Sequence, residues 1–193
     1  MAAPVKILVL STSHRGASKS EYVALRCQEV LQELGAEVNL VTLKDHEFPP
    51  LVVDTIAESV AYKALHPLVS EADGLILTSP VYNWSLSGAL KEFIEHVGST
   101  DNNLRAALFD KVVTFAVVGG LPHGYMAFGP TALSLMLDFR CVINPYQVFV
   151  YDKCWDDGSL TSETENQLRK SMSVMLEMTA LLKGRSYSSN WSV

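Results

Sequence analysis

The sequence predicts an α/β fold in which a doubly wound parallel sheet is covered by helices on both faces. Short apolar runs rich in Val, Ile and Leu alternate along the chain with segments whose apolar residues recur at helical spacing. The runs are mostly continuous, which is typical of parallel strands buried on both faces. Strand then helix recurs five times, and in such a sheet we expect a ligand outside the carboxyl ends of the strands.

Four runs are the clearest strand candidates, at residues 5–10, 37–41, 74–78 and 112–118. A weaker fifth run, at 146–151, follows Asn144 and Pro145. Together they predict a five-stranded sheet.

The first two helices are predicted between the first three strands. Gly35 stops the first helix, whose apolar stripe comprises Val23, Cys27, Val30, Leu31 and Leu34. In the second, Thr55 and Glu58 have capping-box spacing. Pro67 predicts a kink or an early end, because proline lacks the N–H that a helix interior uses.

The third helix is predicted to begin near residues 85–87, to run to about Val97 and to stop at Gly98. Its apolar stripe comprises Leu90, Phe93, Ile94 and Val97. Lys91 and Glu95 have the spacing of an ion pair on its outer face.

The last two helices are predicted in the carboxyl-terminal third of the chain. The fourth runs from about residues 128–130 to Phe139. The fifth begins at Ser162, with Glu165 at capping-box spacing, and ends near Leu182.

Length and composition favour one folded domain. The chain has 193 residues, 48% of them hydrophobic and 19% charged, which gives a sizeable core and too little charge for a disordered chain. We expect one domain over residues 1–183 and a mobile, serine-rich tail at 184–193. The formal net charge of −6 argues against a nucleic-acid partner or an anionic membrane surface.

The cysteines and the apolar segments favour a cytoplasmic protein. Cys27, Cys141 and Cys154 have no disulfide, metal or redox spacing. The run at 5–10 has no cleavage-site pattern behind it, so we interpret it as a strand and not as a signal peptide. Glycines and prolines break the uncharged stretch at 112–137, and we therefore predict no membrane span.

A hydroxyl-rich loop follows the first strand and leads into the first predicted helix. The N–H groups at the start of a helix attract phosphate, and the hydroxyls of Ser13, Ser18 and Ser20 add donors. Arg15 can add a bidentate clamp. In the alternative interpretation, Ser18 only caps the helix and Arg15 is solvated. Neither the Walker spacing nor GxGxxG is present, which argues against triphosphate chemistry.

A second loop follows the third strand. Pro80 restrains it, Tyr82 and Asn83 offer an aromatic face and an amide, and this combination suits a flat heteroaromatic ring. Alternatively, Tyr82 and Trp84 are ordinary loop residues that pack on a neighbour.

A glycine-rich loop follows the fourth strand. Gly119 and Gly120 allow backbone N–H groups to approach a ligand, although glycines at this position also simply turn a chain. Because the first, third and fourth strands are neighbours in a doubly wound sheet, the three loops are predicted to form a single cleft.

Two of these loops resemble motifs of the NADPH-dependent FMN reductase family. Ser13, Arg15 and Ser18 resemble its GSxRxxS loop, with Thr12 in place of the usual Gly and Ser20 in place of the usual Asn. Residues 79–91 resemble its SPxYNxSxxGxLKxxID segment, and the matching positions are Pro80, Tyr82, Asn83, Ser85, Gly88, Leu90 and Lys91. The resemblance covers nearly the whole chain.

The resemblance implies a flavodoxin-like sheet of order 2-1-3-4-5, noncovalent FMN, and NADPH or NADH as cosubstrate. It implies reduction of a small-molecule electron acceptor, namely a quinone, an azo compound, a metal oxyanion or free flavin. Carried over by position, the FMN phosphate is held by Ser13, Arg15, Ser18 and Ser20. The isoalloxazine ring is lined by Pro80, Val81, Tyr82 and Asn83, and the N–H groups of Gly119 and Gly120 contact its pyrimidine side.

Hydride chemistry on FMN requires no catalytic side chain, and none is assigned. The alternative to an enzyme is an FMN-binding electron carrier or regulatory module without significant turnover. Segments 74–90 and 112–137 carry no Asp, Glu, Lys or Arg, and such neutral walls favour the reductase. The dispersed histidines predict no metal site, and His123 is interpreted as a solvated loop residue in preference to a proton relay.

The fourth helix predicts a homodimer or homotetramer. Its large apolar residues are distributed around the helix, so the sheet can bury only part of them: Phe128, Leu133, Leu135, Met136, Leu137 and Phe139. A second copy of the chain is the commonest cover for such a surface. The alternative is that the last helix of the same chain covers it together with an acidic loop, which contains Asp152, Asp156 and Asp157 and is interpreted as solvated surface.

Overall fold

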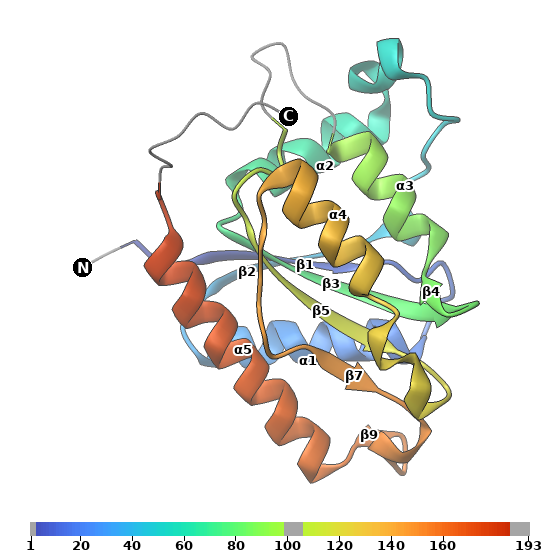
Figure 1. Ribbon diagram of the computed structural model, residues 1–193, viewed down its shortest axis with the longest axis vertical. Coiled ribbons are helices and arrows are strands. Elements are labelled where there is room, and N and C mark those ends of the chain that lie inside the picture. The colour runs from blue at the N-terminus through green and yellow to red at the C-terminus, as the bar shows by residue number, and fades with distance from the viewer. Residues whose placement is uncertain (1–2, 99–105, 186–193) are drawn as a thin grey trace.

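A parallel sheet in the order β2-β1-β3-β5-β6 forms the centre of the protein, and β7 continues the β6 edge by pairing with β5 (Figure 1). The computed structural model describes residues 3–98 and 106–185. The predicted order 2-1-3-4-5 is confirmed, since β5 is the predicted fourth strand and β6 with β7 the fifth. The main strands are β1 (Lys6–Ser11), β2 (Glu37–Thr42), β3 (Gly74–Tyr82), β5 (Val112–Val118), β6 (Val142–Ile143) and β7 (Val148–Val150).

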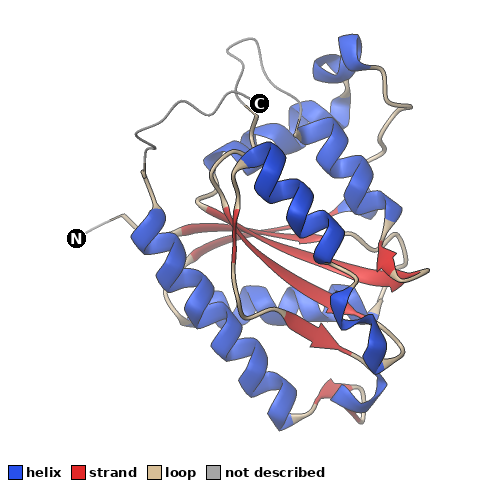
Figure 2. Cartoon of the chain, viewed as in Figure 1, coloured by secondary structure: helices blue, strands red, loops and turns tan. Residues whose placement is uncertain are grey.

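Helices cover both faces of the sheet, as predicted (Figure 2). One face packs on α1 (Lys19–Glu33) and α5 (Ser162–Leu182), and the other on α2 (Val60–Glu71), α3 (Gly88–Val97) and α4 (Gly129–Phe139). Strand β1 supplies both cores, because successive side chains of a strand point to opposite faces. Leu8 and Leu10 lie in the core under α2 to α4, and Ile7 and Val9 in the core under α1 and α5.

The fifth strand begins earlier than predicted and is interrupted. Val142 and Ile143 already pair with β5, and the chain then leaves the sheet until Val148. Side-chain amides occupy the gap: Gln147 Oε1 accepts a 2.6 Å hydrogen bond from Phe115 N, and the buried Asn144 donates to Thr114 Oγ1 at 3.0 Å. Polar residues in this stretch hid the true start of the strand.

The predicted start of α2 is wrong, whereas α5 begins at Ser162 as predicted, and a hydroxyl just before each helix caps it. Residues Val53–Glu58 form a 3₁₀ helix, and α2 is capped by Ser59, whose Oγ accepts from Tyr62 N at 3.1 Å. Thr161 caps α5 in place of the expected Ser162. Glu165 instead forms a 3.0 Å ion pair with Arg26 of α1.

Pro67 does not end α2, which continues to Glu71. Lys111 Nζ donates to the carbonyls of Ser70 at 3.0 Å and Ala72 at 2.5 Å and so satisfies the end of this helix.

Helix α3 agrees with its prediction: Ser87 caps it, Gly98 follows it, and Lys91 pairs with Glu95 at 3.1 Å. Among the described residues, no helix is long and apolar enough to cross a bilayer. Residues 186–193 of the predicted tail lie outside the described residues, so the division at 183 stays a prediction.

Candidate functional site

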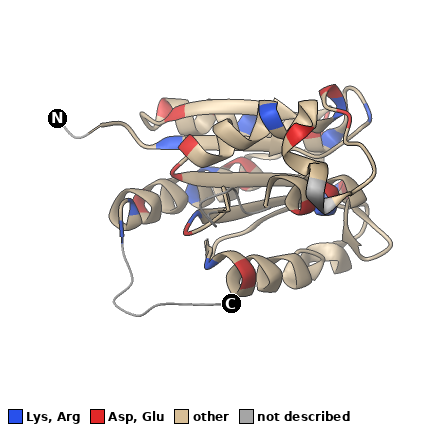
Figure 3. Cartoon of the chain, turned by 90° about the horizontal axis from the view of Figure 1, so that it is seen from above, with Lys and Arg blue, Asp and Glu red and all other residues tan. Residues whose placement is uncertain are grey.

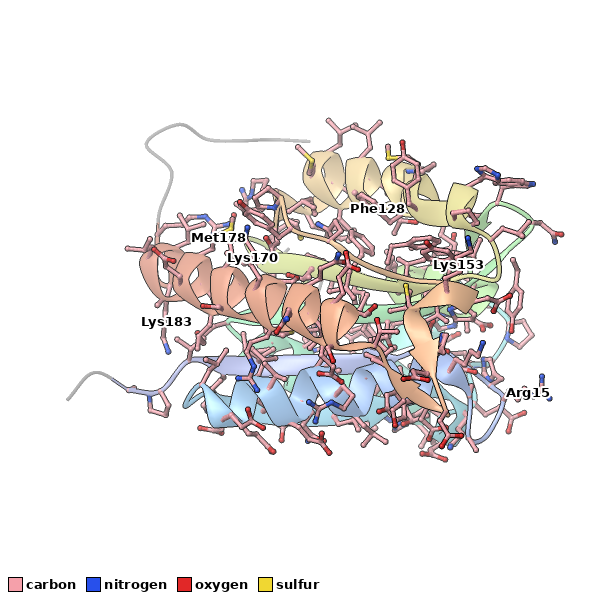
Figure 4. All side chains as sticks on the ribbon, turned by 90° about the horizontal axis from the view of Figure 1, so that it is seen from below. Arg15, Phe128, Lys153, Lys170, Met178 and Lys183 are labelled. Atoms are coloured by element: carbon pink, nitrogen blue, oxygen red, sulfur yellow. The ribbon has the colours of Figure 1, made fainter. Side chains whose placement is uncertain are left out.

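The first predicted loop bends around the amino terminus of α1. Ser18 caps the helix, with its Oγ accepting from Glu21 N at 3.1 Å, and Ser20 Oγ lies 3.2 Å from that same oxygen. Ser13 Oγ accepts from Arg15 N at 3.2 Å. The Arg15 side chain is exposed and points away from the body of the protein (Figure 4). The loop thus has hydroxyls and helix N–H groups together, with one exposed guanidinium beside them.

The second predicted loop is a β-hairpin. Strand β3 continues through Pro80 and Val81 to Tyr82, and the chain returns as β4 (Ser85–Leu86), which pairs antiparallel with the end of β3. The two turn residues, Asn83 and Trp84, have left-handed backbone with φ of 50° and 62°. A two-residue hairpin turn of this kind favours Asn and Gly, and a bulky Trp there is an uncommon, strained conformation. Strain of this kind is concentrated at functional sites.

A cavity of about 400 Å³ lies between this hairpin and the third predicted loop. Its lining comprises Val81, Asn83, Trp84, Gly119, Gly120, Leu121 and Gly124. All of these residues are uncharged, and the volume is in the usual range for a small-molecule site. The second and third loops therefore meet, as predicted. Pro80, Tyr82 and the residues of the first loop are not part of this lining.

Phe149 forms the floor beneath the glycine-rich loop, and the sequence had given it no role. A Cβ added at Gly119 would lie 3.3 Å from Phe149 Cζ, and one added at Gly124 would lie 3.4 Å from it. Both would also approach Val81 to 3.6 Å. Glycine at these two positions lets the backbone lie directly on the Phe149 ring.

The two adjacent glycines differ in their backbone bonding. Gly119 N donates a 2.8 Å hydrogen bond to the carbonyl of Val150, which continues the β5–β7 pairing. The predicted role of the Gly119 N–H towards a ligand therefore needs correction, because the sheet already engages this donor. A ligand contact from this pair falls to Gly120.

Asp152 connects the first loop with the third. Its Oδ1 lies 3.2 Å from Lys19 Nζ, next to the cap of α1, and its Oδ2 lies 3.9 Å from the position of a Cβ added at Gly120. The sequence interpretation placed Asp152 in a solvated acidic loop and missed this position. Both side chains are exposed, so the pair contributes only about 0–1 kcal/mol and can rearrange when an anion binds.

Three buried hydroxyls join the first loop to the second. Thr12, Ser79 and Ser87 are 1%, 0% and 5% exposed. Thr12 Oγ1 lies 2.8 Å from Ser87 Oγ, and Ser79 Oγ donates to Ser87 Oγ at 3.3 Å. No sequence signal pairs Thr12 with Ser87, which lies 75 positions away.

A larger cavity, of about 550 Å³, lies elsewhere, at the amino ends of the strands. Its charged residues are used structurally: Lys111 caps α2, and Arg140 pairs with Asp110 at 3.1 Å. Burial lowers the pKa of Lys111. This cavity is remote from the three loops, and we do not assign it as the site.

Other side-chain chemistry finds little support near the loops. Burial raises the pKa of Cys27 and of Cys141 to about 12, which makes both poor nucleophiles. His123 is exposed in the short helix that follows the glycines. Within residues 3–98 and 106–185, no group of three or more His, Cys, Asp or Glu side chains is arranged to hold a metal ion.

Comparison with known proteins gives consistent matches. The model of the NADPH-dependent FMN reductase family matches residues 5–155, which is more than half of the chain. An FMN reductase (NADPH) of Pseudomonas putida is 33% identical over 55% of this chain and 51% of its own length. An NADPH azoreductase of a Bacillus species is 30% identical over 61% of this chain and 67% of its own length.

The matched region thus spans about half the length of the first relative and two thirds of the second. Among solved structures, the flavoenzyme NAD(P)H:(acceptor) oxidoreductase FerB of Paracoccus denitrificans superposes with a TM-score of 0.74. It is 18% identical, with 92% of this chain and 98% of FerB covered, and it supports the fold alone. The predicted family is confirmed. The chain belongs to the NADPH-dependent FMN reductase family of oxidoreductases.

Proposed function

We propose that this protein holds FMN in the cleft between its three loops and uses it to reduce a small-molecule acceptor with hydride from NADPH or NADH. The acceptors proposed are quinones, azo compounds, metal oxyanions and free flavin. The observation that supports the proposal best is the uncharged cavity between the hairpin and the glycine-rich loop, at the same end of the sheet as the hydroxyl-rich start of α1.

The first loop has the chemistry of a phosphate site. A phosphomonoester would accept hydrogen bonds from the N–H groups at the start of α1 and from the hydroxyls of Ser13, Ser18 and Ser20. The partial positive charge at the helix start would also attract it. Arg15 is exposed beside them and would close over the phosphate. Lys19 would add a second positive charge if it turned from Asp152.

The cavity has the chemistry of a flavin ring site. Val81 and Asn83 line the cavity on the hairpin side, Gly120 lies across from them, and Pro80 and Tyr82 complete the hairpin strand. An uncharged lining suits a neutral ring, and the backbone of Gly120 can approach the ring closely because it has no Cβ. Bound FMN would supply the hydride chemistry, as cofactors of this type do. Trp84 and Leu121 at the rim would exclude water from the reacting face.

The test is turnover by the FMN-loaded protein. We expect it to consume NADPH or NADH when a quinone is added, with the loss of reduced nicotinamide measured by absorbance, whereas protein freed of FMN should not. Should the FMN-loaded protein consume neither nucleotide, the carrier or regulatory module without turnover becomes the better interpretation. A protein to which added FMN does not bind at all would overturn both.

The proposal includes a cytoplasmic homodimer or homotetramer. The three free cysteines favour a reducing compartment. The surface of α4 favours self-association, because Leu133, Met136 and Leu137 are 56%, 49% and 55% exposed. Asp138 is the only charged residue of this helix, which is drawn almost entirely in tan in Figure 3. Within the described part of the chain, neither the loops nor α5 cover these three side chains.

Leu137→Glu is expected to reduce the molecular mass measured by light scattering at micromolar concentration. The wild-type mass should be a multiple of the 21.2 kDa of one chain, and the variant should approach 21.2 kDa. A glutamate at this exposed position has little effect on the fold but repels its copy across a twofold interface. A wild-type mass of one chain would contradict the oligomer, and an unchanged multiple in the variant would contradict the role of α4.

A further inference from the structure

The hydroxyls of Thr12, Ser79 and Ser87 form a buried group between the first and second loops, in which Ser79 Oγ is also within 3.0 Å of Pro80 O. Thr12 is the residue after β1, and its N–H donates to Thr78 O at 3.0 Å, so its backbone is held by the sheet. Ser87 N donates to Ser79 Oγ at 2.9 Å, and Ser87 Oγ accepts from Leu90 N at 3.3 Å. The start of the first loop, Ser79 within β3 and the cap of α3 are thereby joined at one point.

This point lies between the two parts of the proposed FMN site. The loop that begins at Thr12 continues to the phosphate donors at Ser13 and Ser18, and the strand that contains Ser79 continues to the ring site at Val81 and Asn83. A ligand that binds both loops gains from the second contact only when the distance between them matches its own length. A bond that fixes this distance therefore affects the affinity for whole FMN. It does not affect the affinity for a ligand that has only the flavin ring or only the phosphate.

We propose that Thr12, Ser79 and Ser87 are positioning residues. In this proposal the 2.8 Å bond between Thr12 and Ser87 sets the distance between the first loop, here called the phosphate loop, and the second loop, here called the ring loop. The inference rests on the proposed function, because it needs FMN in the cleft. Thr12 stands where the motif of the family has Gly, and a glycine has no hydroxyl with which to make this bond. The Thr12–Ser87 bond, which we call the brace, is thus a property of this chain's own residues.

The test compares three ligands on one variant. Thr12→Val removes the hydroxyl and keeps the shape, and we expect its affinity for FMN to fall about tenfold, the scale of one buried hydrogen bond. Its affinities for riboflavin and for inorganic phosphate should stay within about twofold of wild type, because each of them occupies one loop only. Flavin fluorescence titration measures the first two, and competition with FMN measures the phosphate.

Two variants provide controls. Thr12→Ser keeps the hydroxyl and should bind FMN with the wild-type affinity. Thr179→Val removes an equally buried hydroxyl, which bonds to Met175 O at 2.7 Å at the opposite end of the sheet, and it should change no ligand affinity.

The double variant Thr12→Val with Ser87→Ala should lose no more FMN affinity than the weaker-binding single variant, since both remove the same bond.

The possible outcomes separate this inference from the function on which it rests. Wild type that binds FMN, with a Thr12→Val variant that binds it equally well, overturns the brace and leaves the FMN site standing. Equal losses of FMN and riboflavin would also overturn it, since they would mean that the ring loop itself had deformed. Wild type that binds no FMN overturns the proposed function, and the inference with it.

Discussion

Leu135→Glu is expected to lower the free energy of unfolding by about 4 kcal/mol or more, since it removes a buried apolar side chain and introduces an unpaired charge in the core. Leu135 is 0% exposed and packs in the core between α4 and the sheet. Urea denaturation followed by circular dichroism measures the change. A midpoint close to that of wild type would contradict the placement of α4.

Leu137→Glu is the matched control, because it makes the same substitution on the same helix at a side chain that is 55% exposed. Its free energy of unfolding per folded chain should stay within about 0.5 kcal/mol of wild type once the oligomer is dissociated by dilution. Leu135, although apolar, therefore cannot report on an interface, and only the exposed residues of α4 can. A large loss in both variants would mean that α4 is buried on all sides by its own chain.

Arg15→Ala is expected to weaken FMN binding about 10- to 150-fold, the equivalent of about 1.5–3 kcal/mol for a charged hydrogen bond. Riboflavin, which lacks the phosphate, should bind with nearly unchanged affinity. The reason is that Arg15 belongs to the hydroxyl-rich loop, where its backbone N–H bonds to Ser13 Oγ, and its exposed side chain is in no ion pair within the described residues. Titration of both flavins by fluorescence measures the difference.

Arg169→Ala controls for the loss of one positive charge. Arg169 pairs with Glu33 on the outer surface of α5 and α1, and its removal should leave both flavin affinities unchanged. Equal losses of FMN and riboflavin affinity in Arg15→Ala would show that the loop had deformed or that Arg15 acts elsewhere.

Local patterns predicted the main strands and most helices, because burial on both faces makes parallel strands continuous apolar runs. The run at 112–118 is confirmed residue for residue as β5, and α3 begins and ends at its predicted cap and stop. The fifth strand was placed too late because Asn144 and Gln147 interrupt it. In the folded protein their amides bond to Thr114 and Phe115, residues that local sequence cannot associate with them.

The same contrast between local patterns and contacts distant in sequence applies to the predicted site. Gly119, Gly120 and Val81 come together in the cavity because the ends of the neighbouring strands β3 and β5 meet there, which topology alone predicts. Asp152, Phe149 and the Thr12–Ser87 bond escaped prediction, because each acts through a partner distant in sequence. The FMN contacts of the ten predicted residues remain proposals.

The central position of β1 has a consequence for how the chain can fold. Its first partner, β2, follows directly after α1, so β1, α1 and β2 can associate early as a local unit. Its second partner is β3, and Ile7 must wait to pair with Gly74. Until then one edge of an almost wholly apolar strand has unpaired N–H and C=O groups, which is the kind of edge that attracts other unfinished chains. Synthesis of α2 and β3 therefore closes this edge of β1.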